Sequence, residues 1–319
     1  MLAISSEDIS RVVSRKEVAD AVEQAMLTIE SGDYIMPNRM HLHSGNDTML
    51  IMPCISKGMI STKLVSVFPN NRDKGLPSLY GTLILNDGKT GEPLAIMNGA
   101  TITALRTGAV GGVGVRHLAK KDAKALLVIG TGVQGRNLAL SACLERKFQK
   151  VFTYDINFEN AITFSKELQK ELMGIDVVAV KSVNQGLLEA DVVITATTSE
   201  TPVLPLDKKL MENKCFIGIG SFKPNTRELP EELLSLTDTI FVDTPFAASE
   251  CGDLAIPLAS KILTNEKIVT IGKLINKAHQ VKSPTRVFKS VGVALFDLFT
   301  ANLIYQKALE SGAGKPINL

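Results

Sequence analysis

A glycine-rich stretch near the middle of the chain has the residue spacing of a dinucleotide site. The apolar residues 125–129 lead into Gly130-Thr-Gly132-Val-Gln-Gly135, in which the glycines recur as G-x-G-x-x-G. The first glycine permits a tight turn, the second lets the backbone approach a pyrophosphate, and the third allows a helix to pack closely on a strand. A helix that begins here presents free N–H groups to the phosphates. We therefore expect the cofactor to contact the turn residues Gly130, Thr131, Gly132, Val133, Gln134 and Gly135.

An acidic residue follows at the distance that such a site requires. Asp155 ends the next apolar run, Val151–Asp155, 20 residues beyond Gly135. A carboxylate at this spacing is expected to hold the ribose hydroxyls. It would repel a 2′-phosphate, and no Arg follows within residues 156–158. The sequence therefore favours NAD(H) as the cofactor, and NADP(H) stays open.

Basic residues in the first part of the chain could bind or protonate an anionic substrate. Lys63 stands in an apolar run on the same face as Val65 and Val67. From spacing alone an edge lysine that reaches water is favoured, and a proton donor is the alternative. Arg106 lies in the otherwise uncharged run 101–110, so a buried guanidinium there needs an anionic partner from the protein or from a substrate. Arg39 follows a turn, where a solvated side chain is the default.

Other polar residues are weaker candidates. Ala196, Thr197 and Thr198 end an apolar run where the crevice of a wound sheet forms, so we expect them to touch the cofactor. For Glu228 and Asp253, solvated loop carboxylates are the favoured interpretation. The histidines, at positions 41, 43, 117 and 279, form no cluster with metal-ligand spacing, so no metal is predicted.

The elements that must position these residues belong to the α/β class. Short apolar runs alternate with amphipathic stretches, which is typical of a Rossmann doubly wound parallel sheet. The predicted strands are 126–129, 151–154, 177–180, 192–196, 216–219 and 240–242, with helices over 133–146 and 158–172.

The preceding residues predict a separate α+β unit. The capping box Ser14–Glu17 starts an amphipathic helix that Gly32 ends. Runs at 49–55, 59–68, 78–85 and 93–98 predict antiparallel strands, and residues 99–118, rich in Gly and Ala, predict a bridging helix that could lie very close to another backbone. Residues 287–309 predict a long helix that returns to this unit. We expect a discontinuous substrate-binding and dimerisation domain, 1–117 with 288–319, and a nucleotide domain, 118–287.

Composition points to a small-molecule partner. The 319 residues carry a net charge of +2 without charged runs, which argues against nucleic acid or a membrane surface as a partner. The four cysteines are scattered, and no signal segment or membrane span is apparent, so a reducing cytoplasm is expected.

The chain resembles the ornithine cyclodeaminase/mu-crystallin family over essentially its whole length. The motifs that carry the resemblance are Lys63 within its strand, Gly75–Ser78, Thr103–Ala109, the glycine turn and Lys289–Gly292. The resemblance implies a homodimer with a nicotinamide cofactor. It also implies substrate-binding roles for Arg39, Lys63, Ser78 and Arg106, a catalytic role for Lys63, and cofactor-binding roles for Ser290, Val291 and Gly292.

One position departs from the cyclodeaminase pattern. Where those enzymes keep an Asp after a Gly-x-Gly strand end, this chain has Phe222. A phenyl ring cannot accept the amine proton that closing ornithine into a ring requires. The sequence thus resembles the ketimine reductases, which reduce Δ1-pyrroline-2-carboxylate or Δ1-piperideine-2-carboxylate to proline or pipecolate. A cyclodeaminase, an alanine-type or opine-type dehydrogenase and a mu-crystallin-like nucleotide-binding protein remain alternatives.

Overall fold

The computed structural model describes residues 1–318, with the side chain of residue 72 left aside. The chain forms two compact units, Met1–Arg106 with Val293–Leu319, and Thr107–Gly292. The domains expected from the sequence use the same order of segments with limits at 117/118 and 287/288. We refer to the compact units as unit 1 and unit 2.

Unit 1 is built on a seven-stranded sheet in the order β15-β1-β6-β5-β4-β3-β2. Its strands are β1 (Leu2–Ile4), β2 (Met40–Ser44), β3 (Asp47–Ser56), β4 (Met59–Val67), β5 (Leu79–Asp87), β6 (Pro93–Asn98) and β15 (Lys315–Pro316). The run from β2 to β6 is an antiparallel meander, which confirms the four strands predicted over 49–98. The sheet also contains β2 and the short strands β1 and β15.

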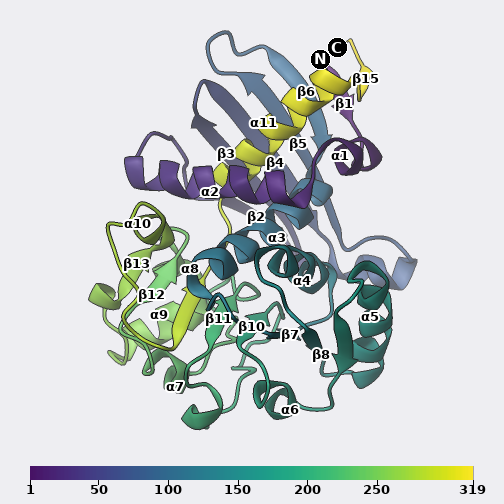
Figure 1. The fold of residues 1–319 in the computed structure, drawn as a ribbon. Coiled ribbons are helices and arrows are strands. Elements are labelled where there is room, and N and C mark those ends of the chain that lie inside the picture. Colours follow the sequence, from purple (N-terminus) through teal and green to yellow (C-terminus); the bar gives the residue numbers. More distant parts are fainter. Residues whose placement is uncertain (319) are drawn as a thin grey trace. The chain divides into compact units, whose positions relative to one another are not determined.

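Two long helices supply the apolar cover of unit 1. The helix α2 (Arg15–Ser31) starts at the Ser14 capping box and ends at Gly32 in the left-handed region, as predicted. The helix α11 (Ala294–Ser311) packs on α2 and on β3, β4 and β5 (Figure 1). A short helix, α1 (Ser6–Val12), and a 3₁₀ turn, η1 (Pro69–Lys74), complete the unit. A residue of α11 can therefore reach the buried face of the central strand β4.

Unit 2 is a parallel eight-stranded sheet in the order β13-β12-β14-β11-β10-β7-β8-β9. The strands are β7 (Ala125–Ile129), β8 (Lys150–Tyr154), β9 (Asp176–Ala179), β10 (Val192–Thr195), β11 (Cys215–Gly218), β12 (Ile240–Val242), β13 (Ile268–Thr270) and β14 (Arg286–Lys289). The chain reverses direction through the sheet between β7 and β10, where a doubly wound sheet binds its ligand. This confirms the predicted Rossmann fold class.

Helices connect the strands of unit 2, as Figure 1 shows. They are α4 (Val133–Glu145), α5 (Phe158–Glu171), α6 (Val183–Leu187), α7 (Glu231–Leu234), α8 (Ala247–Glu250), α9 (Gly252–Ala259) and α10 (Ile271–Ile275), with 3₁₀ turns η2 (Lys208–Leu210) and η3 (Asn265–Lys267).

The helix α3 (Gly99–Leu118) contains the boundary between the units. The expected close approach of its small residues is confirmed in unit 2. A Cβ on Gly108 would lie 2.6 Å from the carbonyl oxygen of Asn137 on α4, and one on Gly114 would lie 2.6 Å from the Phe288 ring. The glycines therefore let α3 pack directly on α4 and on the sheet.

One predicted element is wrong. Residues 287–289 were assigned to the start of the last helix, but they form β14, which lies between β11 and β12 in the wound sheet. The helix begins only at Ala294, after Gly292 adopts φ +71°. The apolar run is continuous across both elements, so hydrophobicity alone could not separate them.

No helix within residues 1–318 is long and apolar enough to cross a membrane.

Candidate active site

The glycine turn of unit 2 has the shape that a pyrophosphate needs. Gly130 follows β7 with φ +101°, and a Cβ there would lie 2.5 Å from the Ala196 carbonyl oxygen. A Cβ on Gly135 would run into the Gly130 carbonyl oxygen, whereas one on Gly132 would meet nothing within 4 Å. Gly132 is the N-cap of α4, and no side chain caps this helix end. The free N–H groups and the open space at Gly132 fit a phosphate group.

Asp155 is held against this turn. Its Oδ2 accepts hydrogen bonds from Thr131 N at 3.2 Å and Thr131 Oγ1 at 2.6 Å, and its Oδ1 accepts one from Asn157 N at 3.0 Å. Burial alone would raise the pKa of Asp155, but these hydrogen bonds lower it. The carboxylate is therefore charged at neutral pH, at the carboxyl end of β8 where a ribose is bound in this fold.

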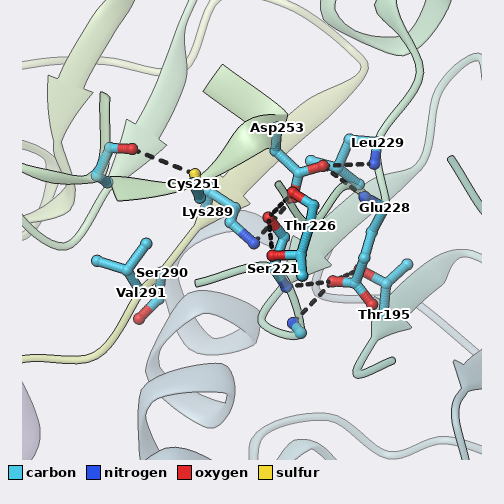
Figure 2. A network of polar contacts seen from close by, with 12 residues as sticks. Thr195, Ser221, Thr226, Glu228, Leu229, Cys251, Asp253, Lys289, Ser290 and Val291 are labelled. Carbon is cyan, nitrogen blue, oxygen red and sulfur yellow. Dashed lines mark hydrogen bonds and ion pairs between the residues drawn. The ribbon is translucent and has the colours of Figure 1, made fainter. Parts of the chain in front are cut away.

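A buried carboxylate is hydrogen-bonded to the carboxyl ends of β10 and β11, next to the place between β7 and β10 where the chain reverses direction through the sheet. Glu228, which has no exposed surface, accepts five hydrogen bonds. Thr197 donates from N at 2.6 Å and Oγ1 at 2.9 Å to Oε1. Thr195 Oγ1 at 2.8 Å, Gly220 N at 2.7 Å and Ser221 N at 3.2 Å donate to Oε2 (Figure 2). Burial raises the pKa of Glu228, and the donated hydrogen bonds oppose that rise.

A second buried carboxylate extends the network to β14. Asp253 Oδ1 accepts from Glu228 N at 2.6 Å and Leu229 N at 2.8 Å, and its Oδ2 lies 2.9 Å from Lys289 Nζ (Figure 2). Asp253 and Lys289 are both fully buried. Burial acts to lower the pKa of Lys289, but Asp253, Glu228 and the other neighbouring groups together raise it. The interpretation of Glu228 and Asp253 as solvated loop carboxylates is therefore wrong.

The predicted cofactor residues after β14 are bonded to a third buried carboxylate. Asp243 Oδ2 accepts from Ser290 Oγ at 2.6 Å, Val291 N at 2.9 Å and Gly292 N at 2.8 Å. These donors are engaged within unit 2. A role of residues 290–292 in cofactor binding stays a prediction.

Phe222 is half-buried. Its ring packs against the apolar core of unit 2. The neighbouring Ser221 is fully buried, and its hydroxyl donates to the Thr226 carbonyl oxygen at 2.5 Å. The loop after β11 thus presents no free carboxylate in the part of the chain described: Phe222 has none, and that of Glu228 has all its donors in place.

In unit 1 the structure brings Lys63 and Arg106 to one anion. Lys63 lies on β4 between β3 and β5, so it is on a central strand and not at an edge. It is 1 % exposed, which excludes a side chain that reaches water. Its Nζ donates to Asp297 Oδ2 at 2.6 Å, and Arg106 Nε donates to Asp297 Oδ1 at 3.1 Å. Burial lowers the pKa of Lys63 to about 8.

Arg39 and Ser78 are the other two predicted substrate residues. The positive charge of Arg39 contributes to the lowered pKa of Lys63, so the two side chains are close enough to interact. Ser78 is half-buried, and its described contact is made by its carbonyl oxygen, which accepts from Phe68 N at 2.8 Å. The substrate-binding roles of these residues stay predictions.

Asp297 is the residue that the sequence reasoning missed. It supplies the protein carboxylate that a buried Arg106 required, and it is fully buried on α11. The one available signal was a lone acidic residue in the apolar run 291–298.

The chain is similar over its whole length to proteins of known function. The model of the ornithine cyclodeaminase/mu-crystallin family matches residues 2–312. A Δ1-pyrroline-2-carboxylate reductase of Bacillus cereus is 34% identical over 99% of both chains. The structure of Thermococcus litoralis Δ1-pyrroline-2-carboxylate reductase in complex with NADH and L-proline superposes with a TM-score of 0.93 at 35% identity, over 99% of this chain and 100% of that one. An archaeal alanine dehydrogenase dimer with bound NAD gives a TM-score of 0.92 at 28% identity, over 100% and 99%. The chain belongs to the ornithine cyclodeaminase/mu-crystallin family.

Proposed function

We propose that this protein is an NADH-dependent reductase of cyclic imine carboxylates, with Δ1-pyrroline-2-carboxylate as the first substrate to test and Δ1-piperideine-2-carboxylate as the second. The observation that carries the proposal is the buried Lys63 ammonium, held among cationic side chains in unit 1 by a single carboxylate. The cationic side chains can bind a substrate carboxylate, and the Lys63 ammonium can donate a proton to a substrate nitrogen. The similarity to a reductase crystallised with NADH and L-proline supports the proposal.

Unit 2 would hold the cofactor. The N–H groups at the start of α4 and the open space at Gly132 would take the pyrophosphate, and Asp155 would take the ribose hydroxyls. Thr197 and Thr198 follow the strand β10, and Thr197 is hydrogen-bonded to Glu228. They lie on the side of the sheet where the nicotinamide half is expected. The cofactor would supply the hydride. We infer NAD(H) because Asp155 is charged and no Arg follows it within residues 156–158. Comparing kcat/KM with NADH and with NADPH tests this preference.

Residues of unit 1 would bind and protonate the imine. The described hydrogen bond of Arg106 uses Nε, so its Nη groups can take the substrate carboxylate end-on, with Arg39 adding a second cation. Reducing C=N adds a hydride to carbon and a proton to nitrogen. With a pKa of about 8, Lys63 is protonated at pH 7 and poised to give that proton up.

The cyclodeaminase alternative needs a group that removes a proton from a substrate amine. Phe222 has no such group, Glu228 is saturated by five donors, and Asp297 lies between two cations. Ring closure of ornithine is therefore poorly supported. An alanine-type or opine-type dehydrogenase would reduce an open-chain imine, and a substrate panel separates these from the cyclic substrates.

A pure nucleotide-binding protein is the alternative from another class. Lys63→Ala distinguishes it: an enzyme loses turnover by more than about tenfold with NADH affinity kept, whereas a binder has no turnover to lose. NADH affinity is measured by the fluorescence of the nicotinamide. Loss of NADH binding in this variant would argue against the division of roles between the two units.

We also propose a homodimer. The strand β2 ends the sheet of unit 1 and exposes 56% of Met40 and 48% of Leu42. An exposed apolar edge strand is a surface that proteins cover. Light scattering should give twice the 34.4 kDa chain mass, and Leu42→Arg should shift the species to monomer. The expected reducing cytoplasmic location stays a prediction.

A further inference from the structure

The buried carboxylate of Asp297 has two cationic neighbours that reach it from different elements. Lys63 comes from β4 and Arg106 from α3, while Asp297 lies on α11, 234 residues from Lys63 in the chain. Each oxygen has its own partner, Oδ2 the ammonium at 2.6 Å and Oδ1 the guanidinium at 3.1 Å. Both side chains are therefore fixed by one anion.

The charges around Lys63 do not balance without Asp297. Arg106 and Arg39 are positive and act to lower its pKa, and Asp297 is the group that raises it. Thr103 Oγ1, at 3.3 Å from Lys63 Nζ, is neutral. On β3, burial raises the pKa of the Cys54 thiol to about 12, so Cys54 is neutral as well. Asp297 is thus the anion that compensates a buried ammonium whose pKa two guanidinium groups act to lower.

The same contact decides which edge of Arg106 is available. Asp297 occupies Nε, and the hydrogen bonds described for Arg106 do not involve Nη1 or Nη2. The flat Nη1/Nη2 edge can take a carboxylate with two parallel hydrogen bonds. Asp297 therefore orients the Arg106 guanidinium through Nε and leaves the Nη1/Nη2 edge available for a substrate carboxylate.

We propose that Asp297 is a positioning residue that keeps Lys63 charged as the proton donor and aims the Nη edge of Arg106 at the substrate carboxylate. This rests on the proposed imine reduction and deepens it, because it names the group that maintains the proton on the donor. Asp297 itself touches neither substrate nor cofactor in this account.

The Asp297→Asn variant removes the negative charge of this side chain and keeps its shape. The amide oxygen of Asn can still accept from Arg106 Nε, so the arginine keeps its orientation. Its NH₂ group then faces Lys63, and two donors cannot bond to each other unless the lysine gives up a proton. The loss of the negative charge and this geometry both favour a neutral Lys63.

The test measures Lys63 protonation directly and activity in parallel. NMR of protein with ¹³C-labelled lysine side chains follows Lys63, whose signal is assigned by its absence in Lys63→Arg. We expect a titration midpoint near 8 in the wild type and a midpoint lower by at least about one unit in Asp297→Asn. The alkaline limb of kcat for imine reduction should shift to lower pH by the same amount, with KM for the imine within about threefold of wild type because Arg106 still binds the carboxylate.

Controls separate positioning from general damage. Thr300→Val changes a fully buried side chain one helical turn further along α11, whose hydroxyl has no described partner, and should leave both the midpoint and the pH profile unchanged. Asp297→Ser is measured in place of Asp297→Asn should circular dichroism show that the latter is unfolded.

Two results would overturn the proposal: an unchanged Lys63 midpoint, or a loss of kcat that is equal at every pH. Should wild-type protein fail to reduce any cyclic imine, the proposed function falls, yet the NMR titration still decides the role of Asp297.

Discussion

The substitution Glu228→Gln should loosen the strand ends that we assign to the cofactor. Glu228 accepts three backbone hydrogen bonds, from Thr197, Gly220 and Ser221, and two from threonine hydroxyls. Hydroxyls can turn to accept from an amide, but backbone N–H groups cannot. Whichever way the Gln amide is oriented, its NH₂ group faces at least one backbone donor.

The magnitude follows from that count. One buried N–H without an acceptor costs about 1 to 3 kcal/mol, and the remaining hydrogen bonds lose the strength that a charged acceptor gives them. Removing a buried charge offsets part of this cost. We expect the free energy of unfolding to fall by about 2 to 4 kcal/mol, and NADH affinity to fall by more than about tenfold because Thr197 and Gly220 are no longer fixed.

The assay is urea unfolding followed by far-UV circular dichroism, since the chain has no Trp, together with NADH titration. Glu212→Gln, at an exposed position, is the matched control and should change stability by less than about 0.5 kcal/mol. A loss below about 1 kcal/mol in Glu228→Gln, with NADH affinity unchanged, would refute the reasoning that five donors make this carboxylate a structural clamp.

Three further predictions follow from the site. First, kcat for imine reduction should fall as pH rises through about 8, because burial lowers the pKa of Lys63 to about that value and only the ammonium form can donate a proton; a flat profile up to pH 10 would exclude Lys63 as the donor. Second, Asp155→Ser should weaken NADH more than tenfold and improve NADPH relative to NADH, because the charge that repels a 2′-phosphate is gone; unchanged KM values for both cofactors would contradict it. Third, Gly130→Ala should abolish NADH binding, because Gly130 has φ +101° and a Cβ would lie 2.5 Å from the Ala196 carbonyl oxygen; calorimetry with NADH tests this, and wild-type affinity would show that the turn tolerates a side chain.

Local patterns were sufficient to predict six of the eight parallel strands of unit 2 and the meander of unit 1. The strands of both units are short apolar runs bounded by turn residues. The glycine turn is recognised from the spacing of three glycines within a single strand, turn and helix. The strand β14 was not predicted because its apolar residues continue without a break into α11. Between the two elements the one turn signal in the sequence is Gly292, which has a positive φ.

The charged groups of the site were harder to predict because their partners are far away in the sequence. Lys63 and Asp297 are 234 residues apart, and Glu228 receives its donors from the ends of two other strands. Nothing near Lys63 in the sequence distinguishes a buried lysine with an anion from an edge lysine in water. The same holds for Asp253, whose partner Lys289 lies on a strand that the sequence did not reveal.

The central claim is that this chain reduces a preformed cyclic imine and does not close ornithine into a ring. Incubation of the purified protein with NADH and Δ1-pyrroline-2-carboxylate tests it, with NADH absorbance and L-proline measured together, beside L-ornithine with NAD⁺ and an ammonia assay. We predict that NADH oxidation and L-proline formation are equal, and that no ammonia is released from ornithine. Ammonia and proline from ornithine, without NADH oxidation on the imine, would contradict the account.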